Sequence, residues 1–330
     1  MNVFSAGGKK MLNMLILEIL KEYTDAEHLL TQQEIIDLLK LNYGVECDRR
    51  SIRNNIQSLK DMGYDIVTQR GCYLAEREFD DAELRMLIDS VLFSKTLSRV
   101  QSKRLIEKLK GFGNRYFHAK VAHVSNLPAL FHTDNKQVMI ALDVLNGAID
   151  KKRKVSFIYN RYGTDFKLRP KRPEPYIVTP YQMVANNGRY YLIGNYDKYD
   201  DLSHYRIDHI TSISMLSEPA KPRNKVKEFS QGWSLPRHMA EHVYMYSGES
   251  VTVKLLTDTG LMDDLIDWFG KDFHIKEEAG GKMMVTLRCN EEAMKYWALQ
   301  YGDCIEIKEP LSLRRAVREV VDRMAVAYAD

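Results

Sequence analysis

The stretch Asp48–Gly63 reads DRRSIRNNIQSLKDMG and decides the fold of the N-terminal part of the chain. Aspartate is a favourable helix N-cap and glycine a favourable helix terminator, so we expect a helix from Asp48 to Met62. At about 100° per residue, the apolar side chains fall on one side of this helix and should pack inward. These side chains are Ile52, Ile56 and Leu59.

The opposite face of this expected helix carries arginines and amides rather than mixed charges. Its side chains are Arg50, Arg53, Asn54 and Gln57. Arginine and amide groups form bidentate contacts with guanine and adenine edges in the major groove of DNA. We also assign Arg49, Ser51 and Lys60 to the DNA-binding surface, because a hydroxyl near the helix start and a lysine at its far end suit phosphate contacts.

The charge of this region leaves an ordinary solvated surface as the alternative. Residues 1–75 carry nine Lys/Arg and ten Asp/Glu, a net charge of −1. Residues 48–60 alone carry four basic residues and one acidic residue, a net charge of +3. Local charge therefore favours a nucleic acid at this helix, although the N-terminal region as a whole is not basic.

The flanking sequence predicts two earlier helices and a small hairpin. Apolar residues recur with helical spacing over 11–23 and 31–41, and Thr31 with Glu34 forms a capping-box signature. Two short strands, 64–67 and 72–74, are expected around the turn at 69–71. Three helices and a hairpin in about 75 residues are typical of a winged helix-turn-helix. Arg70 at the hairpin tip suits a phosphate or minor-groove contact, or simple exposure, and residues 1–10 are expected to form a loose tail.

The residues of this module resemble the DeoR-like winged helix family. The matching segments are Asp48–Arg53, then Leu59 and Gly63, and finally Gly71–Leu74. This chain has an aspartate for the usual serine cap, and Asn54 and Asn55 where that family commonly has arginine and aspartate. The resemblance implies that duplex DNA is bound and that the changed amides alter which bases are read.

The middle of the chain changes from helix to strand. Residues 79–110 are expected to be helical, 111–135 irregular, and 134–151 helical again. Strands are expected at 155–159, 176–185, 189–195 and 205–216, with a tight hairpin turn at Asn186-Asn187-Gly188. Several short antiparallel strands in so few residues suggest a small β-barrel.

The last part of the chain alternates strands and helices. A linker is expected at 219–236, because this segment holds three prolines and several charges. Beyond it the order is β-α-β-β-α-β and a final helix, which is the ferredoxin-like order. The fold class is thus α+β, with a winged helix-turn-helix at 11–76, a helical linker at 77–135, a barrel at 136–217, a linker at 218–249 and a ferredoxin-like domain at 250–330.

Two expected barrel strands, Gly188–Gly194 and His204–Ile210, resemble the WYL domain family, and Pro180-Tyr181 matches its upstream proline element. Tyr190 replaces the tryptophan of the family's name, and His209 stands where the family usually has arginine. The segments Trp297–Gly302 and Ile305–Arg314 are similar to the C-terminal extension that often follows WYL domains. The resemblance implies a regulator whose Sm-like barrel senses a nucleic acid or a nucleotide-type anion.

The residues of the barrel region are compatible with that implied ligand. Residues 148–175 hold nine Lys/Arg and three Asp/Glu, a net charge of +6, with tyrosines among and after them. Cations beside aromatic rings are a common way to hold single-stranded nucleic acid. About half of these tyrosines should be core by strand alternation, and 151–154 could be a solvated helix end. The candidate ligand contacts are Tyr159, Arg169, Arg172, Tyr181, Tyr191, Tyr205 and Arg206.

Arg206 is the strongest of these ligand candidates. It matches the arginine of the resembled family, and it is expected in the middle of a strand. An uncompensated charge there would be costly, which favours a ligand as its partner.

The remaining patterns exclude several classes of function. The chain has no nucleophile elbow, phosphate loop or zinc-protease motif, and its four cysteines lack metal-ligand spacing. No enzyme activity, metal or cofactor is therefore expected. Neither a signal peptide nor a membrane span is expected, and the protein should be cytoplasmic.

The sequence therefore predicts a transcriptional regulator that binds double-stranded DNA, as a homodimer because helix-turn-helix proteins usually read paired half-sites. Its effector would be a single-stranded nucleic acid or a nucleotide. The alternative is a binding module for single-stranded nucleic acid or nucleotides without gene-specific duplex binding.

Overall fold

The computed structural model describes residues 11–121, 133, 135–230 and 232–329. The expected N-terminal tail and part of the expected linker before residue 135 lie outside these residues. The chain divides into two units, Met1–Asp134 and Asn135–Asp330, and each is described by itself. No helix in the described part of the chain has the length and apolar character needed to span a membrane.

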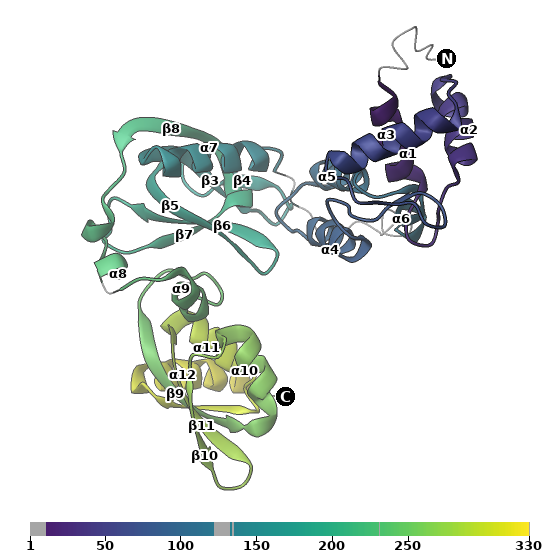
Figure 1. Ribbon diagram of the computed structural model, residues 1–330. Helices are drawn as coiled ribbons and strands as arrows, with labels where there is room; N and C mark the ends of the chain where they lie inside the picture. Colours follow the sequence, from purple (N-terminus) through teal and green to yellow (C-terminus); the bar gives the residue numbers. More distant parts are fainter. Residues whose placement is uncertain (1–10, 122–132, 134, 231, 330) are drawn as a thin grey trace. The chain divides into compact units, whose positions relative to one another are not determined.

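The first unit begins with three helices and a two-stranded hairpin (Figure 1). The elements are α1 (Leu12–Tyr23), α2 (Gln32–Tyr43), α3 (Arg49–Asp61), β1 (Ile66–Val67) and β2 (Tyr73–Leu74). Thr31 and Glu34 form the predicted capping box, and Asp48 accepts a hydrogen bond from the Ser51 N–H at 2.7 Å. Ile52, Ile56 and Leu59 are buried with the apolar faces of α1 and α2.

Residues 79–121 form three helices rather than one helical run followed by irregular chain. They are α4 (Asp81–Leu92), α5 (Arg99–Lys110) and α6 (Arg115–Lys120). The chain breaks between α4 and α5 because Ser98 caps a new helix with Gln101. Asn114 caps α6 through the Phe117 N–H, and Phe117 is buried beside α4 and α5. Gly111 and Gly113 made this segment look irregular in the sequence, so α6 was not predicted.

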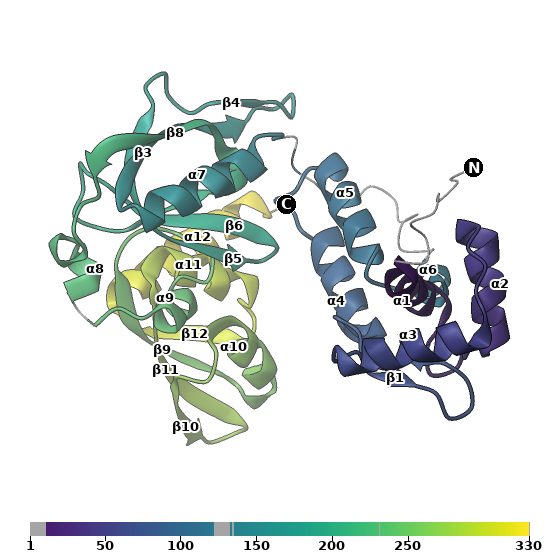
Figure 2. The same cartoon turned by 45° about the horizontal axis from the view of Figure 1, so that its top comes forward.

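The second unit begins with α7 (Val138–Asp150), which packs on a curled antiparallel sheet (Figure 2). The strand order is β4-β3-β5-β6-β7, and β8 also pairs with β3. The strands are β3 (Arg153–Tyr162), β4 (Leu168–Pro170), β5 (Tyr176–Asn186), β6 (Arg189–Tyr196), β7 (Ser203–Arg206) and β8 (Ile210–Pro219). The core between helix and sheet includes Leu145, Phe157 and Leu192.

Two connections between strands of this sheet can be compared with the predictions from the sequence. Asn187 and Gly188 have φ values of 49° and 73°, as a tight β5–β6 hairpin turn requires, so the predicted turn is confirmed. The expected single strand 205–216 is wrong, because a 3-10 turn at Ile207–His209 separates β7 from β8. Across this turn the Asp208 carboxylate accepts hydrogen bonds from Arg206.

The proline-rich segment after β8 contains short helices. They are η4 (Arg223–Lys225), α8 (Lys227–Ser230) and α9 (Leu235–Glu241). Pro236 lies in the first turn of α9, where its missing N–H costs nothing. Pro236 therefore begins a helix at the end of the segment predicted to be a linker, 219–236.

The last part of the second unit is a four-stranded antiparallel sheet with helices (Figure 1). The strand order is β10-β11-β9-β12. The elements are β9 (Ser250–Asp258), η5 (Thr259–Leu261), α10 (Met262–Phe269), β10 (His274–Glu278), β11 (Lys282–Asn290), α11 (Glu291–Gln300), β12 (Ile305–Glu309) and α12 (Leu311–Ala327). Trp297 of α11 is fully buried in its core with Phe269 and Leu313.

Candidate nucleic-acid interface and ligand site

The polar face predicted for α3 is exposed in the structure. Arg49, Arg50, Arg53, Asn54 and Gln57 are exposed, whereas Ser51 and Lys60 are half-buried. The face exists because Ile52, Ile56 and Leu59 hold the other side of α3 in the core. The arginines and amides therefore face solvent, while the apolar side of α3 packs in the core and holds the helix in place.

The side chains of this face differ in how far they are already engaged. Gln57 Nε2 donates to Asp61 Oδ1 at 2.8 Å, and Arg49 Nη2 donates to Gln33 Oε1 at 3.2 Å. Lys60 Nζ donates to Thr68 Oγ1 at 3.3 Å, which places the lysine beside the hairpin. Within the described residues, the side chains of Arg53 and Asn54 make no hydrogen bond or ion pair. These two are therefore the most available for a partner.

The hairpin that carries Arg70 is attached to the segment before α2. Leu30 and Cys72 exchange two backbone hydrogen bonds of 3.0 and 2.6 Å. A Cβ on Gly71 would lie 2.8 Å from Leu29 Cβ, so only glycine allows this close approach. Arg70 is exposed next to this contact.

In the second unit, Arg206 is paired with a buried carboxylate. Arg206 Nε donates to Asp208 Oδ1 at 3.1 Å, and Nη2 donates to Oδ2 at 2.6 Å. The Asp208 side chain is 1% exposed, and that of Arg206 is 27% exposed. Burial lowers the pKa of Arg206, but the bonds to Asp208 outweigh it and the pKa is raised overall. Arg206 therefore has a counter-charge within the protein, so the cost of an uncompensated charge does not by itself require a ligand there.

Two further cationic or titratable groups surround the same carboxylate. Arg189 Nη1 donates to Asp208 Oδ2 at 3.2 Å. His209 Nε2 lies 4.0 Å from that oxygen, is buried, and has no hydrogen-bond partner within the described residues. His209 Nδ1 lies 3.0 Å from the Asn160 carbonyl oxygen. Burial and the Arg206 charge lower the pKa of His209, so its imidazole is held neutral.

Three predicted tyrosines lie around this arginine cluster. Tyr159 Oη accepts the Arg206 backbone N–H at 3.1 Å, and burial raises the pKa of Tyr159 to about 12. The rings of Tyr159 and Tyr205 are 5.4 Å apart, and Tyr205 is a core residue. Tyr191 stands opposite Arg206 in the β6–β7 ladder. The structure therefore brings Tyr159, Tyr191 and Tyr205 together with Arg206, and Tyr205 serves chiefly as core.

The other predicted ligand residues have local partners. The guanidinium carbon of Arg172 lies 3.6 Å from the centre of the Tyr176 ring, and Nη1 donates to Tyr196 Oη at 3.3 Å. Arg169 pairs with Asp165 at 2.7 Å and is 66% exposed. Tyr181 is buried in a second cluster beside Phe229, and its hydroxyl donates to the Lys221 carbonyl oxygen at 2.7 Å. These residues do not contact the Arg206–Asp208 pair.

Asp208 and Arg189, which join Arg206 in one charged cluster, were not among the residues predicted from the sequence. The signal for Asp208 was present in Arg206-Ile207-Asp208, because a half-buried arginine needs a carboxylate nearby. Arg189 carries no comparable signal, because it reaches Asp208 only through the pairing of β6 with β7.

Comparison with known proteins agrees with the motifs of the second unit. The WYL domain family matches residues 141–215, and the WCX domain family matches residues 249–325. The chain is 22% identical over 338 residues to the "Uncharacterized HTH-type transcriptional regulator YobV" of Bacillus subtilis (strain 168), covering 97% of this chain and 98% of that protein.

Among solved structures, one similar chain is the proteasome accessory factor B/C (PafBC) of Arthrobacter aurescens. It is 16% identical with a TM-score of 0.30, covering 100% of this chain, which spans 52% of that chain. Another is a CRISPR Cas-related protein, which is 15% identical with a TM-score of 0.39, covering 77% of this chain and 75% of the other. The two domain matches, in the order that the sequence motifs predicted, show that the chain carries a WYL domain at 141–215 and a WCX domain at 249–325.

Proposed function

We propose that the protein is a DNA-binding transcriptional regulator that senses a nucleic-acid or nucleotide-like ligand through its WYL domain. The observation that carries the proposal is the exposed face of α3, with Arg53 and Asn54 unengaged beside Arg50. The similarity to an HTH-type transcriptional regulator over nearly the whole chain supports it.

We further assign the parts of the chain to specific folds. Helices α1–α3 with the β1–β2 hairpin support a winged helix-turn-helix at 11–76. The curled sheet supports an Sm-like barrel at 136–217. The order β-α-β-β-α-β with sheet order β10-β11-β9-β12 supports a ferredoxin-like domain at 250–330. Residues 77–135 and 218–249 connect these domains.

In the proposed complex α3 enters the major groove. Arg50, Arg53 and Asn54 contact base edges. Gln57 also contacts a base after its hydrogen bond to Asp61 breaks. Ser51, Lys60 and Arg70 contact the backbone and orient the helix, with Arg49 beside them. The Leu30–Cys72 bridge attaches the hairpin that carries Arg70 to the segment before α2.

The proposed effector site centres on Arg206. Two guanidinium groups share the single carboxylate of Asp208, which leaves a local excess of positive charge. Such an excess beside Tyr159 and Tyr191 suits a phosphate with a stacked base. The effector would compete with Asp208 for one of the two arginines.

Salt-dependent binding to genomic DNA tests the proposal. The full-length protein is mixed with a labelled duplex from upstream of its own gene, and fluorescence anisotropy is measured between 50 and 200 mM salt, where about six phosphate contacts would change affinity roughly a thousandfold. Saturable binding that an unrelated duplex does not compete away is expected. Binding only to single strands would instead favour the alternative, a single-stranded nucleic-acid module.

We also propose that the regulator acts as a cytoplasmic homodimer, because helix-turn-helix proteins usually read paired half-sites. Sedimentation with a two-half-site duplex tests this: a single protomer per duplex at saturation would contradict it.

A further inference from the structure

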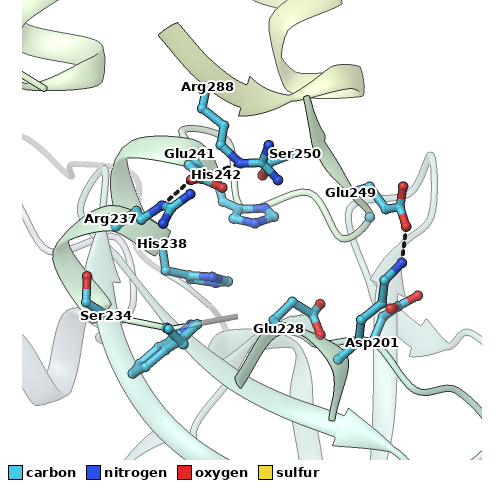
Figure 3. A pocket seen from close by; sticks show the side chains of 14 residues that line it. Asp201, Glu228, Ser234, Arg237, His238, Glu241, His242, Glu249, Ser250 and Arg288 are labelled. Carbon is cyan, nitrogen blue, oxygen red and sulfur yellow. Dashed lines mark hydrogen bonds and ion pairs between the residues drawn. The ribbon is translucent and has the colours of Figure 1, made fainter. Parts of the chain in front are cut away.

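A pocket of about 350 Å³ lies in the second unit, and none of the residues assigned above to DNA or ligand binding is among its described lining residues. Its lining residues come from α8, residues 232–234, α9, the segment that enters β9, and β11, together with Asp201. Figure 3 shows their side chains. The volume is at the lower end of the range for small-molecule sites, about 300–1,000 Å³. The pocket therefore suits a ligand of only a few heavy atoms.

One end of this pocket carries an excess of positive charge. Arg237 Nε and Arg288 Nε lie 2.8 and 3.3 Å from the same oxygen, Oε1 of Glu241. Figure 3 shows these three side chains together at one side. Because one carboxylate serves two guanidinium groups, an additional carboxylate would be stabilised there.

The side across from Arg237 carries an excess of negative charge (Figure 3). Glu228, Asp201 and Glu249 line this side, and the only lysine among the described lining residues, Lys227, bonds to Glu249. Glu228 Oε1 accepts the Leu202 N–H at 2.7 Å. Burial raises the pKa of Glu228, and the hydrogen bond from the Leu202 N–H and the charge of Lys227 offset only part of this rise.

Three polar atoms of the pocket residues are buried without a hydrogen-bond partner in the described part of the chain. They are Glu228 Oε2, Trp233 Nε1 and Ser250 Oγ. A buried polar group without a hydrogen-bond partner destabilises the folded state. Because these three residues line the pocket, small rotations of their side chains toward a bound molecule would supply the missing hydrogen bonds.

The groups between the two charged ends are uncharged. His238 Nε2 lies 2.8 Å from His204 Nε2, and His242 Nδ1 lies 2.9 Å from the Tyr246 carbonyl oxygen. Burial lowers the pKa of His238 to about 3 and also lowers that of His242. Among the described residues no group of three His, Cys, Asp or Glu side chains fits a metal ion. The pocket thus has two opposite charged ends and a neutral aromatic middle.

We propose that this pocket binds a small zwitterion, with its carboxylate at Arg237 and Arg288 and its ammonium at Glu228. A free amino acid is the simplest molecule of this kind. A nucleotide fits less well, because its phosphate would bring two negative charges to a pocket that already holds four carboxylates. The inference goes beyond the proposed function and does not depend on it.

Isothermal titration calorimetry of the full-length protein tests this inference. The common L-amino acids are titrated one at a time, and the tightest binder is compared with its N-acetyl and C-terminal amide derivatives. Each derivative lacks one charge and should bind about tenfold more weakly or worse, because a hydrogen bond between charged groups is lost. AMP serves as the competing class of ligand.

Two variants place the ligand in the pocket. Glu228→Gln keeps an acceptor for the Leu202 N–H but removes the negative charge, and Arg288→Gln removes a charge at the other end. Both should weaken amino-acid binding about tenfold or more, while the exposed Glu278→Gln on β10 should leave it unchanged. The inference is overturned if no amino acid binds, if the derivatives bind equally well, if AMP binds more tightly, or if both pocket variants bind like the wild type.

Discussion

Asp208 is held by Arg206 through two hydrogen bonds, Nε to Oδ1 at 3.1 Å and Nη2 to Oδ2 at 2.6 Å. The carboxylate is 1% exposed and also accepts from Arg189 at 3.2 Å. Because Arg206 and Arg189 share the single carboxylate of Asp208, one of the two positive charges is not neutralised within this cluster. Whichever arginine binds Asp208 less strongly is the one available to another anion.

Replacement of Asp208 by alanine should destabilise the second unit. Removal of one member of a buried ion pair costs about 3–5 kcal/mol. Since both arginines remain partly exposed, we expect about 2–3 kcal/mol, measured as the free energy of unfolding in urea. The matched control is Asp165→Ala, which breaks the exposed pair with Arg169 and should cost less than about 1 kcal/mol. Equal losses for the two variants would contradict the role given to Asp208.

Substitutions on α3 should separate base contacts from phosphate contacts. Arg53→Ala should weaken binding to the preferred duplex by about 1–3 kcal/mol and relax the preference at one base pair. Lys60→Ala should weaken binding to all duplexes alike and lower the salt slope by about one. Anisotropy titrations against a small library of duplexes measure both, and the exposed Lys103→Ala on α5 is the control. A uniform loss for Arg53→Ala would assign Arg53 to the DNA backbone.

Gly71→Ala should weaken DNA binding without touching α3. The added Cβ would meet Leu29 Cβ at 2.8 Å, so the hairpin must move away from the segment before α2. We expect a loss of about 1–3 kcal/mol in unfolding free energy from this overpacking and weaker binding than for Arg70→Ala, which removes only a side chain. If Gly71→Ala bound DNA like the wild type, the position of the hairpin would be irrelevant to recognition.

The histidine cluster at the pocket should make the second unit sensitive to acid. Burial lowers the pKa of His238 to about 3, whereas the unfolded chain takes up this proton near the ordinary value of 6.5. Between these values the unfolded state binds more protons, so stability is complete above about pH 6.5 and falls as the pH drops toward 3. Glu241 and Arg237 on α9, His204 and His242 face or flank the same group.

Thermal unfolding between pH 7.5 and 5, about the range over which histidine changes charge, measures this dependence. His238→Gln should flatten the pH profile of the second unit, whereas His274→Gln on exposed β10 should not. An unchanged profile for His238→Gln would show that His238 is not kept neutral by the fold.

The features predicted best from the sequence are those that depend only on nearby residues. The Thr31–Glu34 capping box, the Asp48 cap and the Asn187–Gly188 turn each depend on neighbours within a few residues. The WYL motif was also readable, because the segments 188–194 and 204–210 resemble that family despite Tyr190 and His209, and the family matches residues 141–215.

The features that sequence analysis missed depend on contacts between distant residues. The helix α6 is stabilised by burial of Phe117, and proline at 236 starts a helix instead of ending one. Two ligand candidates lie away from Arg206 for the same reason. Arg172 bonds to Tyr196, 24 positions away, and Tyr181 bonds to the Lys221 carbonyl oxygen, 40 positions away. No local pattern reports such pairings.

The lack of internal partners at Arg53 and Asn54 has a consequence for the descent of this protein. Because neither side chain contributes a hydrogen bond or ion pair to the described fold, most replacements there should cost little stability. If α3 reads DNA as proposed, its base preference can then change by single mutations while the fold stays intact. Paralogues that arose by gene duplication could diverge toward separate promoters without first acquiring compensating changes in the core.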